Sequence, residues 1–484
     1  MKSVVIATIG TRDLMFQVTS GKWFNIGDDR MQDGDIIGEQ AEVLSDLGLP
    51  SSSYRELTQY LLEHHSLYLE RIKPVIIGGL LGDRISDIER IYLIGTDQKP
   101  DIREREKDTL HSCNLIQRWV ESQLNTDIAV ETILVGQDGT NPSNFEEMFR
   151  WWREVWCDRI QVKENQPIWL CLKGGVGQAA EAGRISGLSR YGDRIQFFEF
   201  ARTPRKNQDG IPSEYSGPFL GTNYLWDRTQ QQSLALLNRY DYDALGNLLT
   251  NYWKQDPEGF KIIKPLVKAG KLWNQGQFEQ FFAEAKGSLT LQQKEQTHEY
   301  WWKAYEEAYL AVVRLEQKNT VEAMFHSFRA IEALTKDWVV VTFPNAVKPH
   351  PNKFPSLHRS ICQEFSNNQR LANLFGSNET IELSRWSLQV LTEAAIPQMR
   401  NNADFRPFWK TAGDLRNQLA HTIYGLPPQD LFKAWQVSNQ QQWEKRILHC
   451  LNLITQQSFS SLLQPSLFAS THYRLKGLIP NYTP

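Results

Sequence analysis

The chain has 484 residues, of which 41% are hydrophobic and 23% are charged, and its formal net charge is -3. This length exceeds one ordinary hydrophobic core, so two or three folded domains are expected. The slightly acidic balance excludes a protein that coats long nucleic-acid duplexes, because such proteins need a concentrated basic excess. Any RNA site is therefore expected to be a small local pocket.

The cysteines and the apolar runs further limit the possible classes of protein. The five cysteines show neither the spacing of a zinc site nor that of a disulfide framework. No apolar run approaches the ~18–20 residues that a membrane-spanning helix needs. The first residues enter a strand-like segment directly, without the pattern of a signal peptide. We expect a cytoplasmic protein with no metal site and no membrane partner.

Residues 1–200 alternate short apolar runs with amphipathic stretches. Each run is apolar on both faces, as buried parallel strands are, and the runs cover residues 4–9, 91–94, 133–135, 168–172 and 195–200. Helical patterns lie between them, at 54–72, 108–124, 144–157 and 178–191. This alternation predicts a Rossmann-like, doubly wound sheet whose binding crevice lies at the carboxyl ends of the strands.

The remainder of the chain reads as helical. Residues 201–230 are rich in proline and glycine, which predicts a linker or an exposed loop. Beyond them almost every segment has helical period, apart from a Pro-rich interruption at 343–355. The expected fold class is α/β plus all-α, with an α/β domain over 1–200, a linker and connecting helices over 201–300, and a helical domain over 301–484.

Three predicted strands end in glycines, hydroxyls and charged side chains. Because parallel strands end at one edge of their sheet, these groups are expected to lie together. Glycines let the backbone approach a ligand closely, and amides at a following helix N-terminus suit phosphate oxygens. Threonine hydroxyls can bond a ribose or phosphate, and lysine or arginine can supply charge. The predicted ligand-binding residues are Gly10, Thr11, Arg12, Asp13, Thr96, Asp97, Lys173, Gly174, Gly175, Val176 and Gln178.

The glycine loop at 174–177 matches neither of two common phosphate loops. It lacks the GxGxxG spacing of a dinucleotide site and the GK[ST] ending of a Walker A loop. An alternative is that the glycines only serve tight strand–helix turns. Three such loops at one sheet edge favour a phosphate-bearing ligand.

The strand end Gly10-Thr11-Arg12-Asp13, with the later loop Lys173-Gly174-Gly175, resembles the CARF domain over about the first 200 residues. CARF domains are the cyclic-oligoadenylate sensors of type III CRISPR systems, so the resemblance implies a cyclic oligoadenylate activator. Many related loops read Gly-Gly-Thr-Pro where this chain has residues 174–177. This departure leaves open which ring binds and whether the pocket also cleaves it. A two-fold ring would match a two-fold dimer, which favours an even number of adenylates. Of the even rings, cyclic tetra-adenylate is favoured over cyclic hexa-adenylate.

One hexapeptide of the second half, Arg416-Asn417-Gln418-Leu419-Ala420-His421, combines a permanent cation, an amide and a titratable imidazole. The apolar spacing of Phe408, Ala412, Leu415, Leu419 and Ile423 puts it on an amphipathic helix that ends before Gly425. Five positions at ~100° each separate Arg416 and His421 by roughly 140° around the axis. Either this helix is irregular at its end, or a second copy of the chain completes the site.

The R-x4-H pattern resembles that of HEPN ribonucleases, which are dimers with composite sites. Residues 328–334 also resemble the early HEPN helix with its Arg and Glu, and together the two segments cover about residues 300–460. The resemblance implies that Arg416 and His421 are the catalytic pair of a homodimer and that Asn417 positions them. A similar pair, Arg105 and His111, is set aside because the adjacent Glu106 would repel a phosphodiester. The alternative for the late pair is an Arg416–Asp414 salt bridge and a helix-capping histidine.

The expected reaction is metal-independent transesterification of single-stranded RNA. The ribose 2′-hydroxyl attacks the adjacent phosphorus and gives a 2′,3′-cyclic phosphate and a 5′-hydroxyl. Arg416 would hold the non-bridging oxygens, and His421 would move or orient a proton. DNA lacks this nucleophile and is expected to be inert. The preferred function is an oligoadenylate-activated endoribonuclease of antiviral defence; the alternatives are a ring nuclease in the sensor pocket and a non-catalytic, RNA-binding regulator.

Overall fold

The computed structural model describes residues 2–27, 39–124, 127–201, 204–349 and 354–483. The chain divides into two compact units, Met1–Trp226 and Asp227–Pro484, here named unit 1 and unit 2. The boundary falls inside helix α9, Gly221–Asn238. Each unit is described by itself. No helix in the described part of the chain is both long and apolar enough to cross a bilayer.

Unit 1 contains a six-stranded sheet in the order β6-β5-β1-β7-β8-β9. Neighbouring strands are parallel except for β9, which is antiparallel to β8. The strands are β1 Ser3–Thr8, β5 Ile88–Thr96, β6 Ala129–Val135, β7 Ile168–Cys171, β8 Ile195–Phe200 and β9 Tyr215–Leu220. The predicted α/β fold with buried parallel strands is therefore confirmed.

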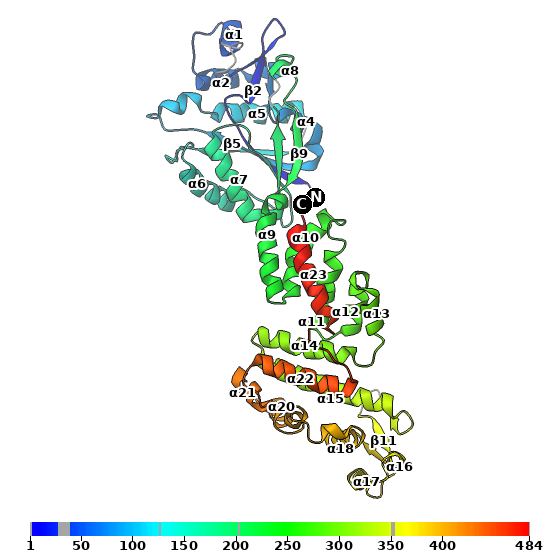
Figure 1. The fold of residues 1–484 in the computed structure, drawn as a ribbon. Coiled ribbons are helices and arrows are strands. Elements are labelled where there is room, and N and C mark those ends of the chain that lie inside the picture. Colours follow the sequence, from blue (N-terminus) through cyan, green and yellow to red (C-terminus); the bar gives the residue numbers. More distant parts are fainter. Residues whose placement is uncertain (1, 28–38, 125–126, 202–203, 350–353, 484) are drawn as a thin grey trace. The chain divides into compact units, whose positions relative to one another are not determined.

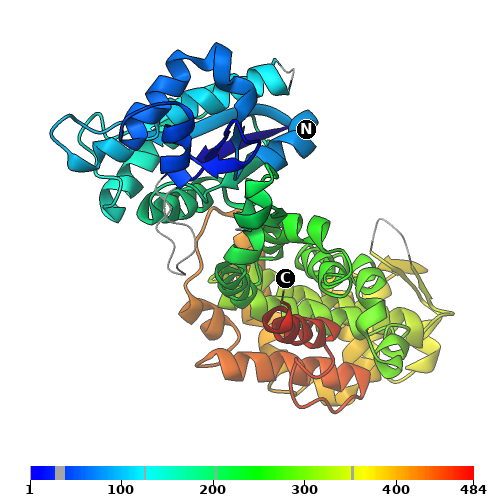
Figure 2. The ribbon, with the colours of Figure 1, turned by 90° about the horizontal axis from the view of Figure 1, so that it is seen from above.

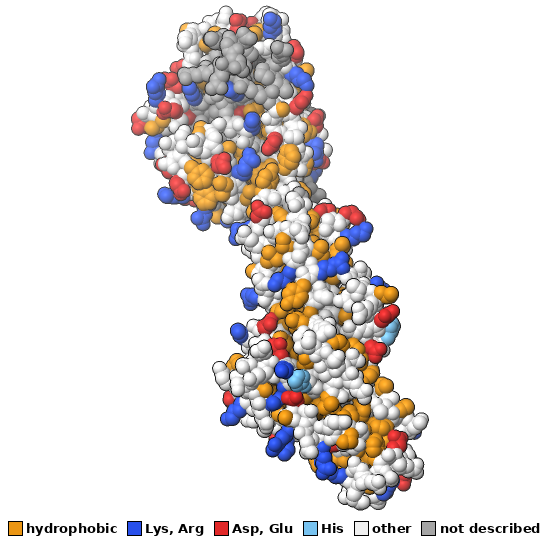
Figure 3. Space-filling model, viewed as in Figure 1, with side chains coloured by type: hydrophobic (Ala, Val, Ile, Leu, Met, Phe, Trp, Pro, Cys, Tyr) orange, Lys and Arg blue, Asp and Glu red, His pale blue; other side chains and the backbone are white. Residues whose placement is uncertain are grey.

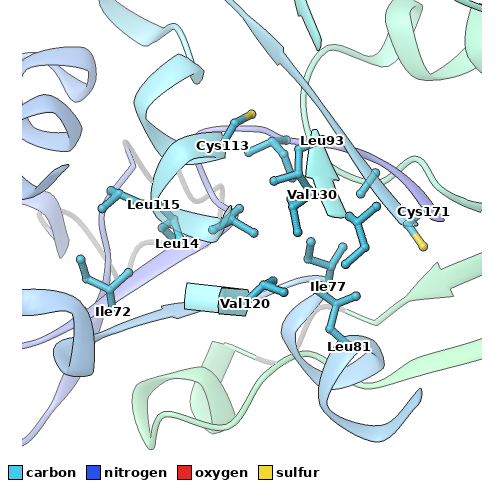
Figure 4. Packing of buried hydrophobic residues seen from close by; sticks show 14 of the residues in the cluster. Leu14, Ile72, Ile77, Leu81, Leu93, Cys113, Leu115, Val120, Val130 and Cys171 are labelled. Atoms are coloured by element: carbon cyan, nitrogen blue, oxygen red, sulfur yellow. The ribbon is translucent and has the colours of Figure 1, made fainter. Parts of the chain in front are cut away.

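Helices cover both faces of this sheet (Figure 1). Successive residues of β1 enter opposite cores, because side chains alternate across a strand: Val5 and Ala7 join one cluster, Val4 and Ile6 the other. Figure 4 shows the aliphatic packing of the first cluster. The helices that contribute are α2 Tyr54–Glu63, α4 Gly78–Arg84 and α5 Leu110–Gln123 on the first face, and α6 Phe145–Asp158 and α7 Gly177–Tyr191 on the other.

A small antiparallel sheet, β3-β2-β4, follows directly after β1. Its strands are β2 Leu14–Gln17, β3 Trp23–Asn25 and β4 Ile72–Pro74, and helix α1, Glu39–Asp46, lies nearby in the chain. The prediction of one helix over 54–72 is wrong beyond Glu63, where α2 ends. Short helices, α3 His65–Tyr68 and the 3-10 turn Leu69–Arg71, lead to Ile72, which pairs with Phe16 in the sheet. The apolar spacing alone does not separate these short helices from one long helix.

The predicted linker over 201–230 is wrong in its second half. Residues Tyr215–Leu220 form strand β9, and Gly221–Asn238 form helix α9; α8, Pro204–Gln208, precedes them. Proline is tolerated in β9 because this strand lies at the sheet edge and pairs only with β8. Gly217 has φ +127, and a Cβ there would lie 2.7 Å from the carbonyl oxygen of Phe197. Gly217 is thus required by this edge strand and Pro218 is tolerated in it, so neither residue marks a loop here.

Unit 2 is mostly helical, and α14, α15 and α22 pack side by side (Figure 2). A stacked pair of rings, Trp273 and Phe468, joins α11 to α23, with centroids 3.6 Å apart. Three short strands form a small sheet that the helical period did not predict: β10 Val347–Lys348, β11 Ser356–His358 and β12 Thr380–Glu382. The longer helices are α10 Tyr242–Gln255, α11 Ile263–Asn274, α12 Phe278–Ala285, α14 Trp302–Glu316, α15 Thr320–Thr342, α18 Arg385–Ala395, α20 Gly413–His421, α22 Gln440–Thr455 and α23 Leu467–Asn481.

Candidate functional sites

A cavity of about 650 Å³ opens in unit 1 at the carboxyl ends of β1, β5 and β7. The connections that leave β1 and β7 run to opposite sides of the sheet, so this is the point at which α/β sheets bind ligands. Most of the predicted ligand-binding residues line it: Gly10, Thr11, Arg12, Asp13, Thr96, Lys173, Gly174, Gly175 and Val176.

Two predicted residues do not line this cavity. Gln178 is exposed in the first turn of α7. Asp97 is instead held by Arg55 at 2.8 Å and by the side-chain amide of Gln137 at 2.7 Å. Burial alone would raise the pKa of Asp97, but these hydrogen bonds and the charges of Arg55 and Arg105 bring it below its usual value. Asp97 therefore fixes the surrounding loops.

The loops after β1 and β7 touch through their glycines. A Cβ on Gly10 would overlap the backbone nitrogen of Gly175, and a Cβ on Gly174 would lie 2.7 Å from the nitrogen of Gly10. Gly175 has φ +80, which side-chain-bearing residues rarely adopt. The glycines at 10, 174 and 175 are therefore required by the close packing of two loops and the φ of Gly175. The same packing forms one wall of the cavity.

Asp13 lies beneath this wall with only 1% of its surface exposed. Its Oδ2 accepts a hydrogen bond from the backbone N–H of Gly10 at 2.5 Å, while its buried Oδ1 has no hydrogen-bond partner among the residues that the structure describes. Burial raises the pKa of Asp13 to about 7, against the opposing effect of the Gly10 amide. The carboxyl is thus expected to change its charge near neutral pH, next to the glycine loops that follow β1 and β7.

An Asp13→Asn variant should gain stability relative to the parent as pH rises. The folded carboxyl keeps its proton up to a pKa of about 7, whereas a carboxyl with the ordinary value of 3.8 loses it much earlier. The parent is therefore destabilised progressively between about pH 4 and pH 7, and asparagine, which does not ionise, is not. Thermal unfolding at pH 5 and pH 8 should show the difference growing by roughly 2–4 kcal/mol. An unchanged difference would mean that Asp13 is ionised throughout.

Sequence reasoning missed the far wall of the cavity. It includes Trp23, Phe24 and Asn25 of β3, Ser213, and two residues of α8. The Nζ of Lys73 lies 4.6 Å from the ring centroid of Trp23. Two short apolar runs, at 14–18 and 23–24, with Gly21 between them, were the available signal for this small sheet.

Helix α20 of unit 2 carries the predicted catalytic residues. The Nη2 of Arg416 lies 3.3 Å from Glu332, and its Nη1 donates to Oδ1 of Asn417 at 2.9 Å. The guanidinium carbon sits 4.6 Å from the ring centroid of Phe328. Phe328 and Glu332 both belong to α15, within the segment that resembles the early HEPN helix. The structure thus joins the two segments singled out in the sequence.

The alternative pairing of Arg416 with Asp414 does not form. Asp414 lies 3.7 Å from Arg385, and Arg416 pairs with Glu332 instead. Arg329, the other charged residue of the resembling segment, pairs with the buried Glu307. The two charged residues of that segment therefore form ion pairs with different partners: Arg329 with Glu307, and Glu332 with Arg416. The early pair also differs in setting: Arg105 donates to the carbonyl of Gln98, and burial lowers the pKa of His111.

His421 is the last residue of α20 and is exposed. The following Thr422 is extended, so Ile423, predicted to continue the apolar face, instead lies beyond the helix and is fully exposed at 109%. Since Arg416 and His421 both lie in regular α-helix, the separation of roughly 140° applies to them. The predicted irregularity at the end of the helix is absent from α20. Completion by a second chain stays a prediction.

The irregular turn lies before α20 rather than at its end. Residues Phe408–Ala412 form a π-helix, a wider turn that is often found at functional sites. Arg385 of α18 donates to the carbonyl oxygens of Trp409 and Lys410 in this turn. A Cβ on Gly413 would overlap the guanidinium of Arg385. Glycine at this position therefore lets Arg385 hold the turn from which α20 starts.

The fold defines a class: an α/β unit with its cavity at the strand ends, followed by a helical unit whose helices α15 and α20 carry the Arg416 cluster. Among solved structures, Enterococcus italicus Csm6 bound to cyclic hexa-2'-fluoro-hexa-dAMP has this fold. The two chains match with a TM-score of 0.60 over 99% of each, at 12% sequence identity. No protein-family model matches the chain, and no curated protein does. The expected fold, an α/β unit followed by a helical unit, is therefore confirmed.

Proposed function

We propose that this protein is a cyclic-oligoadenylate-activated endoribonuclease of type III CRISPR defence, acting in the cytoplasm. One observation carries the proposal above the others. Arg416 is oriented by Glu332, Asn417 and the ring of Phe328, while His421 is exposed on the same helix. An oriented guanidinium and an accessible imidazole on one helix are the groups that cleavage at a phosphodiester needs, once a second copy of the chain brings them together.

The activator is proposed to occupy the unit 1 cavity. The Csm6 neighbour was solved with a ring of six adenylate-like units. The loops after β1 and β7 bring backbone amides and Lys173 to the cavity, which suits a ring of phosphodiesters. A ring with an even number of adenylates fits the two-fold axis of a homodimer. Cyclic tetra-adenylate remains our favoured ring, and cyclic hexa-adenylate is its competitor. Binding activates only if the ring prefers the active arrangement to the resting one.

The proposed reaction needs both residues of the pair at one scissile phosphate. Arg416 would stabilise the charge that builds on the non-bridging oxygens, Asn417 would keep that guanidinium in place, and His421 would move or orient the proton. Because ~140° of helix separates Arg416 from His421 within one chain, we propose that the site is completed in a homodimer. The products are a 2′,3′-cyclic phosphate and a 5′-hydroxyl, with no divalent metal required.

The test is incubation of labelled single-stranded RNA with cyclic tetra- and hexa-adenylate, with and without excess chelator. We expect cleavage only with a ring present, survival of cleavage in chelator, and no cleavage of DNA of the same sequence. End-group analysis should find the cyclic phosphate. RNA left intact with every ring would remove the proposal and favour a non-catalytic regulator. Loss of the ring itself on incubation would support the second candidate, a ring nuclease in the unit 1 cavity.

Lys173→Ala should weaken activation about tenfold in ring concentration, as expected for the loss of one charge-assisted contact worth ~1.4 kcal/mol. Lys173 is exposed at the cavity rim, so the change should leave folding intact. The maximal cutting rate at saturating ring should stay the same. A direct titration that gives unchanged ring affinity would take Lys173 out of the site.

A further inference from the structure

A cavity of about 570 Å³ opens in unit 2 beside α17, Gln369–Phe375, and the second half of α18. Its volume lies in the range of ~300–1,000 Å³ typical of small-ligand sites. The charges on its rim balance, with Glu364 and Glu393 against Arg370 and Arg400. Residues 367–369, which also line it, all carry side-chain amides. A balanced, amide-rich rim suits the hydrogen-bonding edge of a neutral nucleobase better than a phosphate.

Arg370 joins this cavity to an exposed aromatic ring. Its guanidinium carbon lies 5.1 Å from the ring centroid of Trp386, whose side chain is 55% exposed. Glu393 holds Arg370 at 2.6 Å and is itself held by the amide of Gln389 at 2.6 Å. Trp386 therefore has one face covered by a fixed cation and offers a rigid platform for stacking.

The residue next to Trp386 in the sequence connects this platform with the candidate catalytic helix α20. Trp386 follows Arg385, the residue that holds the π-turn before α20. The guanidinium carbons of Arg385 and Arg416 lie 5.9 Å and 4.6 Å from the centroid of the same ring, Phe328. From Arg385 to Glu393, α18 rises by about 12 Å, a span that a short stretch of extended RNA can cover. Hydrophobic side chains gather over this part of unit 2 (Figure 3).

We propose that Trp386, Arg370 and the adjoining cavity form a subsite that binds one unpaired nucleobase of the RNA, next to the phosphate held by Arg416. The base stacks on Trp386, and the amides and glutamates of the rim receive its polar edge. The inference rests on the proposed ribonuclease function and adds a substrate-positioning site to it. It also requires the substrate to be single-stranded, because a paired base does not offer its edge and face together.

The test measures RNA binding without cleavage. A fluorescent single-stranded RNA is titrated into the full chain carrying His421→Ala, and anisotropy gives the affinity. Adding Trp386→Ala should weaken binding roughly five- to hundredfold, whereas Trp386→Phe should retain most of it. Arg370→Ala should also weaken binding, by about fivefold, through loss of the fixed platform. Tyr473→Ala is the matched control, because Tyr473 is an aromatic residue of α23 with 58% exposure.

In the cleavage-competent chain, Trp386→Ala should raise KM with little change in kcat. Unchanged RNA affinity and KM in this variant would overturn the inference. So would a loss of self-association on sedimentation without a loss of RNA affinity, which would mark Trp386 as a contact between copies. Failure of the proposed function looks different. In that case the parent cuts no RNA with any ring, while the anisotropy comparison still decides whether Trp386 binds it.

Discussion

His421→Ala should lower the oligoadenylate-dependent cutting rate by about 10²–10⁴, the usual value of one positioned proton donor or acceptor. The same substitution should leave the melting temperature unchanged, because His421 is exposed at the last position of α20. Ring binding should also be retained, since the predicted activator site lies in unit 1. Gel assays of labelled RNA and thermal unfolding of the same preparation measure the two effects separately.

Arg416→Ala is expected to be equally inactive but less stable. Its removal leaves Glu332, only 17% exposed in its side chain, without its arginine, and takes a cation from the ring of Phe328. Arg329→Ala is the matched control, because it breaks a similar ion pair between α15 and the buried Glu307. We expect Arg329→Ala to lose stability and to keep cutting. Cutting that persists in both His421→Ala and Arg416→Ala would end the nuclease assignment.

Gly10→Ala should abolish ring binding and activation. The added methyl would overlap the backbone nitrogen of Gly175, and backbone cannot move aside as a flexible side chain can. The loop after β1 must then separate from the loop after β7, which removes one wall of the cavity. Isothermal titration with the cyclic oligoadenylate measures the loss, expected to exceed a hundredfold, equivalent to about 3 kcal/mol.

Gly177→Ala is the matched control in the same loop. A Cβ there meets nothing within 4 Å, and Gly177 is the first residue of α7. Alanine favours helix over glycine by up to ~1 kcal/mol, so this variant should bind the ring as the parent does and be slightly more stable. Equal binding by the Gly10 and Gly177 variants would show that the contact between the two loops is irrelevant to the ligand.

The sequence predicted the sheet well because parallel strands buried on both faces leave a distinct pattern. The edge strand β9 was not predicted because it contains the dipeptide Gly217-Pro218, and such a dipeptide is also typical of loops. Asp97 was predicted at the correct end of its strand, but its side chain forms an ion pair with Arg55 and does not line the cavity. The sequence position determines the sheet edge at which a residue lies, not the direction of its side chain. Trp23 and Phe24 lie in a small sheet whose central strand β2 pairs with β4, a segment more than fifty residues further along the chain.

The candidate catalytic cluster was only partly accessible to sequence reasoning. A resemblance linked residues 328–334 to Arg416, and the structure supplies the contacts: Phe328 and Glu332 hold the guanidinium, but Arg329 does not. The neighbour Asp414 was the simplest partner in sequence, and it is satisfied elsewhere by Arg385. Competition among several nearby charges decides such pairings, and spacing along one helix does not record it.

The π-turn at Phe408–Ala412 has a consequence for how this helix tolerates change in length. A π-turn holds one residue more than the α-helical turn it replaces, and one residue turns everything downstream by about 100°. Deletion of a single residue there would leave every letter of the hexapeptide intact and still swing the guanidinium away from the ring of Phe328. The π-turn therefore sets the orientation of the hexapeptide around the helix axis. A comparison restricted to the six residues of the motif would not detect a change in that turn.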